Sequence, residues 1–317
     1  MDEVLGVRPA RGRILIIRGG AIGDFILTLP AIAALRQQFP EAFLEVLGYP
    51  HIAQLAVAGG MVDRAQPIEA RAMAGFFARG GDLEEGLAEY FSEFNIIISY
   101  LYDPDKIFRT NVTSVSKAQF IEGPHRPIET ENTPASQVYL RPLERLAIFE
   151  ADPVPRLAIP WKPARPDTQD ETPMLALHPG SGSETKNWPE ENWAALLEEL
   201  INATSFRLLL AGGEAEGERL QRLAAALPPS RFRVAQSLPL THLAGLLQRC
   251  RGFVGHDSGV SHLAAALGLP GVVLWGATRE EVWRPPSDKI TLLRGAAGLG
   301  GIAVRDVMEA VRTMAVS

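Results

Sequence analysis

The chain has 317 residues, of which 46% are hydrophobic and 21% are charged, a composition typical of a globular protein with a substantial core. Its formal net charge of −6, with no basic surplus in either half, excludes a protein that binds nucleic acid through phosphate contacts. The single cysteine, Cys250, excludes an intrachain disulfide and a cysteine-based zinc site.

The N-terminal residues carry Asp2 and Glu3 and have no apolar run before Arg13, which is unlike a secretory signal. The most apolar stretch, residues 262–277, is too short to span a bilayer and is interrupted by glycine and proline. We therefore expect a soluble, cytoplasmic protein, and peripheral contact with a membrane surface stays open.

Short apolar runs in the first 160 residues predict buried strands, which are residues 13–18, 43–48, 95–100 and 118–122. Residues 31–39 have apolar side chains at helical spacing, with Pro30 in the first turn of this helix or at a kink. Residues 82–94 predict an amphipathic helix whose acidic face is solvated.

Residues 160–173 contain four prolines and almost no apolar side chains, which predicts a linker over residues 161–173. The alternation of strands and helices then restarts, with predicted strands at residues 174–178, 206–211, 252–255, 271–275 and 290–293. Helices are expected to begin at residues 189, 216, 241, 258 and 305. We therefore predict two doubly wound α/β domains, residues 1–160 and 174–317, with ligands at the carboxyl ends of their strands.

The first loop of interest, Gly19-Gly20-Ala21-Ile22-Gly23-Asp24, follows the first predicted strand. A dinucleotide fingerprint is excluded because Arg18 stands where its first glycine is required, and because the second strand ends without an acidic residue. The glycines, Gly23 among them, still permit close backbone approach to a ligand. Asp24 is either a cap of the following helix or a general base that takes a proton from an acceptor hydroxyl.

A second loop after a strand, residues 178–186, is rich in glycine and hydroxyl groups. Ser181 and Ser183 can donate to phosphate oxygens, and Lys186 supplies a positive charge. The loop is not a phosphate-binding loop of the Walker type, because no glycine precedes Lys186. After the next strand, Glu214 and Glu216 are candidates to accept both hydroxyls of a ribose, or are simply acidic residues at a helix start.

A third loop, Asp257-Ser258-Gly259, leads into an apolar helix that carries His262 in its first turn. Ser258, Gly259 and the amides that follow predict an anion-binding helix start. His262 is either a structural histidine or a second contact to the same anion. No group of His, Asp, Glu or Cys has the spacing of a metal site.

Together these segments resemble glycosyltransferase family 9, the heptosyltransferases that build the inner core of lipopolysaccharide. The resemblance extends over most of the chain and rests on residues 14–18, 23–24, 29–31, 178–180, 186–189, 212–216, 257–259, 262–266, 276 and 283–285.

The resemblance implies the GT-B architecture, in which two Rossmann-like domains face a central cleft, with the acceptor on the first domain and the donor on the second. It also implies transfer of a heptose from ADP-L-glycero-D-manno-heptose with inversion at the anomeric carbon, and with neither a metal nor another cofactor. The acceptor would be a glycan or glycolipid such as the lipopolysaccharide core. Such an acceptor would allow peripheral contact with the inner face of the inner membrane.

The resemblance assigns roles by matching position. Asp24 would be the catalytic base, and the Ser258 and Gly259 amides would hold the donor diphosphate together with Lys186. His262 would lie close by, and Glu216 would bind the ribose, with Glu214 as its competitor. Ser181, Ser183 and Asp257 complete the expected donor site.

The acceptor site is less defined by the sequence. Gly23, Lys106 and Arg109 are candidates on the acceptor side, and Lys117 and Arg126 are further basic residues that either meet an anionic glycan or are surface charges. Two other functions stay open beside the transferase, namely a sugar-nucleotide epimerase of the same fold and a non-catalytic protein that binds a nucleotide sugar.

Overall fold

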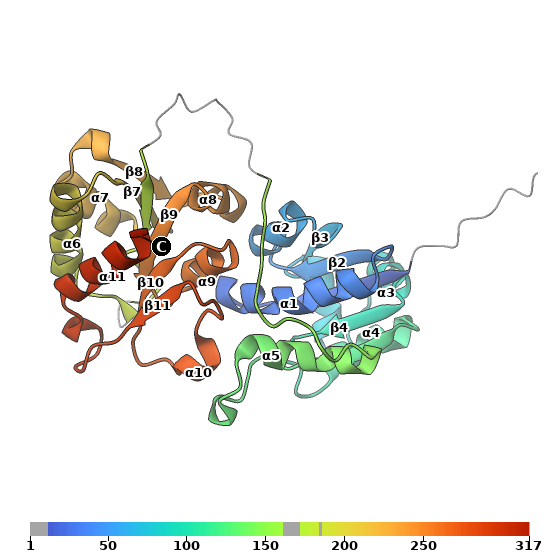
Figure 1. The fold of residues 1–317 in the computed structure, drawn as a ribbon. Helices are drawn as coiled ribbons and strands as arrows, with labels where there is room; N and C mark the ends of the chain where they lie inside the picture. Colours follow the sequence, from blue (N-terminus) through green and yellow to red (C-terminus); the bar gives the residue numbers. More distant parts are fainter. Residues whose placement is uncertain (1–11, 161–171, 184–185, 317) are drawn as a thin grey trace, which may run out of the picture.

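The computed structural model describes residues 12–160, 172–183 and 186–316, and these residues form two sheets surrounded by helices (Figure 1). Most of the predicted linker, residues 161–171, lies outside the described residues. The strand pairs of both sheets are parallel, as expected where strands alternate with crossover helices. The α/β class predicted from the sequence is therefore confirmed.

The first sheet has five strands in the order β3-β2-β1-β4-β5. Its strands are β1 (Arg13–Arg18), β2 (Phe43–Gly48), β3 (Arg64–Pro67), β4 (Ile96–Ser99) and β5 (Gln119–Glu122). Its α-helices are α1 (Ile22–Gln38), α2 (Pro50–Ala58), α3 (Glu85–Ser92), α4 (Ile107–Val115) and α5 (Ala135–Leu140). Its 3-10 helices are η1 (Arg71–Phe77), η2 (Glu129–Glu131) and η3 (Arg141–Leu146).

The second sheet has six strands in the order β11-β10-β9-β6-β7-β8. Its strands are β6 (Met174–Leu177), β7 (Arg207–Gly212), β8 (Phe232–Gln236), β9 (Cys250–His256), β10 (Gly271–Leu274) and β11 (Ile290–Leu293). Its helices are α6 (Glu190–Ala203), α7 (Gly217–Ala225), η5 (Pro229–Arg231), α8 (Leu240–Leu247), α9 (Gly259–Ala266), α10 (Glu280–Trp283), η6 (Leu299–Gly301) and α11 (Val304–Val316).

The sequence missed β3 and β8, and both lie at an edge of their sheet. In β3 all four residues are half-buried, and in β8 only Ala235 is buried. An edge strand needs no apolar run, because only part of it is covered. The position expected for Pro30 was also wrong in one respect, since α1 begins at Ile22 and Pro30 lies in its interior.

In each sheet the order in which successive strands are added reverses between two central strands. This reversal point is where a ligand site is expected. The change lies between β1 and β4 in the first sheet and between β6 and β9 in the second. In parallel sheets the crevice at the carboxyl ends of such strands is the usual ligand site. The loops at Gly19–Asp24 and Asp257–Gly259 follow β1 and β9, and the loop that begins at His178 follows β6, so all three glycine-containing loops lie at these points.

The two sheets meet through their helices, and α1 packs against α9 (Figure 1). The contact is close because it involves glycine: a Cβ added to Gly259 would lie 2.6 Å from Ile22 Cβ. Helices α2 and α8 also pack together, and the Leu157 N–H donates to the Ala266 carbonyl at 2.8 Å. The starts of α1 and α9 are therefore held side by side.

Candidate functional site

Two cavities lie between the halves of the molecule. The first, the Asp24 cavity, has a volume of about 610 Å³ and combines residues that follow β1, β4 and β5 with residues of the second half. Its lining includes Arg18, Gly23, Asp24, Tyr49, Tyr102, His125, Arg126, Ser181, Lys186, Asp257, Ser258, Gly259, His262, Thr278 and Trp283. Nine of the candidate site residues named from the sequence therefore line one cavity, and they come from both halves of the molecule.

The second, the Glu216 cavity, has a volume of about 490 Å³. Many of its lining side chains are apolar, among them Ile52, Ala235, Leu238, Leu240 and Leu243, and Glu216 lines it as well. Both cavities are lined by Ser181, Ser258 and Gly259. The two cavities therefore adjoin at these residues.

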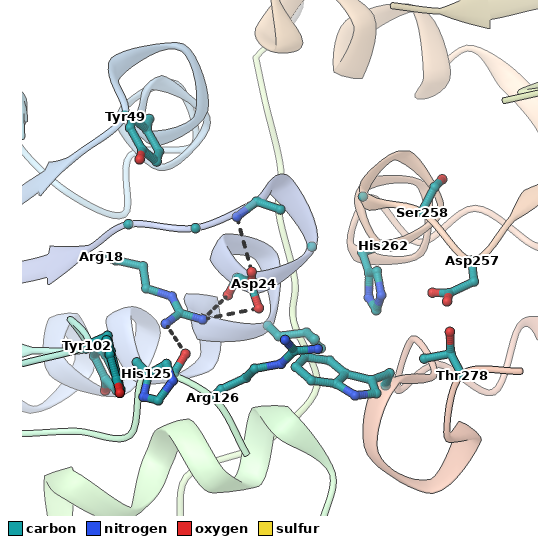
Figure 2. Close-up of a pocket in the computed structure, with 18 of the residues that line it drawn as sticks. Arg18, Asp24, Tyr49, Tyr102, His125, Arg126, Asp257, Ser258, His262 and Thr278 are labelled. Carbon is teal, nitrogen blue, oxygen red and sulfur yellow. Dashed lines mark hydrogen bonds and ion pairs between the residues drawn. The ribbon is translucent and has the colours of Figure 1, made fainter. Parts of the chain in front are cut away.

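Asp24 lies at the start of α1, with its side chain 27% exposed toward the Asp24 cavity (Figure 2). Its Oδ2 accepts the Ala21 N–H at 3.1 Å, which satisfies one of the free donors of the helix start. The two interpretations offered by the sequence are therefore compatible. One carboxylate oxygen caps the helix, and the carboxylate still reaches the cavity.

Arg18, the last residue of β1, pairs with the Asp24 carboxylate. Its guanidinium is only 2% exposed, and Nη2 lies 3.6 Å from Asp24 Oδ1 while Nη1 donates to the His125 carbonyl at 3.0 Å (Figure 2). The guanidinium also lies over the Tyr139 ring at 4.4 Å. A cation this buried persists only when it is paired and hydrogen-bonded. These contacts fix both Asp24 and the segment after β5 around one buried charge.

His262 is buried in the first turn of α9 and faces the same cavity as Asp24 (Figure 2). Burial lowers the pKa of its imidazole to about 4, although the nearby carboxylates of Asp257 and Asp24 act in the opposite direction. The ring is therefore neutral at pH 7. Its Nδ1 is buried and has no hydrogen-bond partner in the structure.

The loop after β6 brings Ser181 and Lys186 to the cavity. Ser181 Oγ lies 2.8 Å from Asn187 Oδ1 and 2.9 Å from the Ser183 carbonyl. Lys186 Nζ donates to Asp257 Oδ2 at 2.9 Å, and the lysine side chain stays 45% exposed. Ser183 is exposed and is not part of either cavity lining. The ion pair with Asp257 therefore holds the Lys186 ammonium group beside the cavity.

Ser258 occupies the N-cap position of α9, but its side chain makes no capping hydrogen bond. Its Oγ instead lies 3.4 Å from His178 Nδ1 and 3.4 Å from Ser261 Oγ. The first N–H groups of a helix have no partner within the helix and carry its positive dipole end. Because Gly259 lines both cavities, the start of α9 lies where they adjoin, a position that suits an anion.

Of the two acidic candidates after β7, Glu216 lines its cavity and is 8% exposed, whereas Glu214 is exposed and is not part of that lining. Glu216 Oε2 accepts the Gly213 N–H at 2.8 Å, and Oε1 accepts the Gly182 N–H at 3.3 Å. The carboxylate therefore joins two loops, and its remaining lone pairs are available to a ligand hydroxyl.

The acceptor-side candidates named from the sequence fall into two groups, those that line the Asp24 cavity and those that do not. Gly23 lines the Asp24 cavity, whereas Lys106, Arg109 and Lys117 do not. Arg109 pairs with Glu122, so its charge is already satisfied. Of the basic residues considered for the acceptor, Arg126 is the one that lines the cavity.

Arg126 has aromatic neighbours that the sequence analysis did not predict. Its guanidinium lies over the Trp283 ring at 5.3 Å, and Tyr102 packs against His125 with ring centroids 4.6 Å apart. Tyr102 follows β4 and His125 follows β5, so the signal was their place at the carboxyl ends of parallel strands. Inspecting every strand end, rather than glycine-rich loops alone, would have found them.

Among residues 12–160, 172–183 and 186–316, no group of three or more His, Cys, Asp or Glu side chains is arranged to hold a metal ion. In the same part of the chain, no helix has the length and apolar character needed to cross a bilayer.

Comparison with known proteins places these features in a family. The profile of glycosyltransferase family 9 (heptosyltransferase) matches residues 141–299, half of the chain. A lipooligosaccharide heptosyltransferase 2 from Haemophilus influenzae is 31% identical over 170 residues, which are 48% of this chain and 49% of that protein. The chain therefore spans about half the length of this curated relative.

Two solved structures have the same fold over nearly the whole chain. The E. coli ADP-heptose lipopolysaccharide heptosyltransferase II has a TM-score of 0.75 at 21% identity, with 96% of this chain and 98% of that chain covered. The E. coli heptosyltransferase WaaC with ADP has a TM-score of 0.72 at 19% identity, with 95% and 99% covered. The predicted GT-B fold is confirmed, and the chain belongs to glycosyltransferase family 9, the heptosyltransferase family.

Proposed function

We propose that this protein transfers a heptose from ADP-L-glycero-D-manno-heptose to a hydroxyl of a lipopolysaccharide-core or related glycan, with inversion and without a metal ion. One observation carries the proposal: the Asp24 carboxylate and the open start of α9 face the same cavity from opposite halves of the molecule. A base and an anion site on either side of one space are what a single displacement from a nucleotide sugar requires.

The donor lies across the two cavities in this proposal. The Glu216 cavity receives the nucleoside, because it combines apolar side chains with a carboxylate that can accept from ribose hydroxyls. The diphosphate lies where the two cavities adjoin, at Ser181, Ser258 and Gly259, beside Lys186. The heptose then extends into the Asp24 cavity toward His262. We assign donor binding to residues 174–317 and acceptor binding to residues 1–160, joined by residues 161–173 as the linker.

The acceptor enters the Asp24 cavity on the side of Tyr102, His125 and Arg126. Its hydroxyl gives its proton to Asp24, while its oxygen forms the new bond to the anomeric carbon. The bond from that carbon to the diphosphate oxygen breaks, and ADP leaves with the electron pair. The charge that develops on the leaving group is stabilised by the N–H groups of α9 and by Lys186. Attack and departure on opposite faces of the carbon give inversion.

Arg18 keeps the base in place throughout this step. Because its guanidinium is buried and also bonded to the His125 carbonyl, it fixes the Asp24 carboxylate relative to the acceptor side of the cavity. A glycolipid acceptor would bring the protein to the inner face of the inner membrane as a peripheral protein.

The proposal is tested by incubating the protein with ADP-heptose and a lipopolysaccharide-core acceptor in EDTA, and following donor and product by NMR. We expect a glycoside whose anomeric configuration is opposite to that of the donor. Conversion of the donor sugar without acceptor would instead indicate an epimerase. Binding of the donor without turnover, with a panel of acceptors, would indicate a binding protein. Turnover that EDTA abolishes and a divalent cation restores would contradict the metal-free mechanism.

A further inference from the structure

The loop that carries Ser181 and Lys186 is held at two backbone points by one buried side chain. We call residues 178–183 and 186–188 the donor loop, which connects β6 to α6. His256, the last residue of β9, has 0% of its surface exposed and lies beneath this loop. Its Nδ1 lies 3.2 Å from the Gly180 carbonyl, and its Nε2 accepts the Trp188 N–H at 2.8 Å.

These two contacts fix the protonation of the ring. Because Trp188 donates to Nε2, the proton of the neutral imidazole must lie on Nδ1, from which it is donated to the Gly180 carbonyl. A protonated ring would have no acceptor for the Trp188 N–H. Burial lowers the pKa of His256 to about 4, so the neutral form that serves both contacts is the one present at pH 7.

The ring itself cannot move easily. It packs edge-on against Trp193 with centroids 5.4 Å apart, and Trp193 in turn packs against Trp188. The indole of Trp188 is buried and donates from Nε1 to the Ile302 carbonyl at 3.0 Å. Both loop anchors are therefore attached to a packed aromatic cluster rather than to solvent-exposed chain.

The opposite side of the donor loop is equally close-packed. Glu216 accepts the Gly182 N–H, and a Cβ added to Gly180 would lie 2.1 Å from Glu216 Cγ. Gly180 is thus confined between Glu216 on one side and His256 on the other. Immediately after β9, Asp257 faces the cavity and accepts a hydrogen bond from Lys186 Nζ at 2.9 Å. Two consecutive residues at the end of β9 therefore fix the donor loop: His256 holds its backbone, and Asp257 holds the Lys186 ammonium group.

We propose that His256 is a positioning residue that preorganises the donor loop for the diphosphate, by fixing Gly180 and Trp188 on either side of Ser181 and Lys186. The inference rests on the proposed donor site. Its physical basis is that a loop already held in its binding conformation loses less conformational entropy when the ligand arrives. His256 itself does not line either cavity and need not touch the donor.

Three substitutions separate the two contacts. His256→Asn keeps an amide N–H at the level of Nδ1 for the Gly180 carbonyl but loses the acceptor for Trp188. His256→Gln places a side-chain oxygen at the level of Nε2 for the Trp188 N–H but loses the donor to Gly180. His256→Phe keeps a ring against Trp193 and loses both. Val254→Ala is the matched control, because Val254 is fully buried in β9 and lines neither cavity.

The experiment has two measurements, hydrogen exchange of the Trp188 amide without nucleotide and calorimetric titration with ADP. For His256→Phe we expect exchange at Trp188 to rise about tenfold or more and ADP to bind about tenfold more weakly, as for the loss of two hydrogen bonds. His256→Gln should keep the Trp188 protection and lose less affinity, and His256→Asn should lose the protection. Val254→Ala should unfold at a lower temperature with ADP affinity unchanged.

Unchanged Trp188 protection in His256→Asn would overturn the inference, and so would a loss of ADP affinity in Val254→Ala as large as in the His256 variants. If His256→Phe does not fold, the Gln and Asn variants decide the question. Failure of the unsubstituted protein to bind ADP would contradict the proposed donor instead, while the exchange measurement, which uses no nucleotide, would still decide whether His256 holds the loop.

Discussion

The starts of α1 and α9 share one local architecture but differ in what their polar groups do. Each follows a central parallel strand and a short loop with glycine, and the two lie side by side between the sheets. At α1, Asp24 turns back and accepts the Ala21 N–H, so a carboxylate occupies the positive end of the helix. At α9, the Ser258 side chain makes no such bond, and the helix start stays open.

The difference teaches how one supersecondary unit serves two kinds of chemistry. A helix start that carries its own carboxylate repels a phosphate but can present a base, whereas one with free N–H groups attracts a phosphate. The opposed placement of the two starts then brings base and anion site to one cavity. The comparison therefore predicts that substitutions at α1 act on turnover and substitutions around α9 act on donor binding.

The largest effect is expected for Asp24→Asn, which keeps an oxygen for the Ala21 N–H but cannot take a proton. Turnover should fall by about 10²- to 10⁴-fold, the usual contribution of a general base. Steady-state kinetics with saturating donor measure this loss, and the melting temperature serves as the control for the cap. Nearly full activity in Asp24→Asn would assign this residue to helix capping alone.

A smaller effect, on the other side of the comparison, is expected for Lys186→Ala. Loss of one charge-assisted contact to phosphate should raise the dissociation constant for ADP by about 10- to 100-fold. Lys186→Arg is the matched control, because it keeps the charge beside Asp257. An ADP affinity that Lys186→Ala leaves unchanged would mean that the lysine only pairs with Asp257.

The contact between the two helix starts can be probed with a pair of glycines. A Cβ at Gly259 would lie 2.6 Å from Ile22 Cβ, whereas a Cβ at Gly23 would lie 3.2 Å from His262 Cδ2. Gly259→Ala should therefore destabilise the protein by about 1–3 kcal/mol, the range for overpacking, and Gly23→Ala by less. Denaturant unfolding compares the two, and equal losses would argue against a tight α1–α9 contact.

Acid stability distinguishes the two halves of the chain in a different way, through pH rather than substitution. Burial lowers the pKa of His178, His256 and His262 to about 4, and all three lie in the second half of the chain. In the unfolded chain each would bind a proton from about pH 6.5 downward. Each histidine should therefore remove about 1.4 kcal/mol of stability per pH unit as the pH falls from 6.5 toward 4.

Unfolding followed at several pH values measures this loss, and His178→Gln should reduce the dependence because one such group is removed. Residues 174–316 should lose amide protection before the first sheet does. A stability that stays constant between pH 6.5 and 4.5 would show that these imidazoles are not held neutral by the fold.

Much of the fold and part of the site could be predicted from local patterns. The buried central strands could be predicted from their apolar runs. The loops after β1, β6 and β9 could be predicted from glycine-containing turns that precede helices. The strands β3 and β8 could not be predicted in this way, because a strand that is only partly covered can carry polar residues. The sequence also placed Asp24, Ser258 and Lys186 at strand ends, which is a local property.

Pairings over long distances in the chain could not be predicted. Arg18 contacts the His125 carbonyl 107 residues later, and His256 joins Gly180 and Trp188 across neighbouring strands that are far apart in sequence. Such contacts depend on strand order, since β9 lies beside β6 although two strands intervene in the chain. For the same reason Lys106 and Arg109 were plausible acceptor residues by charge, yet their positions lie outside the cavity.

The most direct test concerns the different roles of the two helix starts, a base at α1 and donor binding at α9. It is a titration with ADP, in EDTA, of the unsubstituted protein, Asp24→Asn and Lys186→Ala. We predict that the first two bind ADP with the same affinity and that Lys186→Ala binds it more weakly. A loss of ADP affinity in Asp24→Asn as large as that in Lys186→Ala would contradict the account, because the carboxylate at α1 would then belong to the donor site.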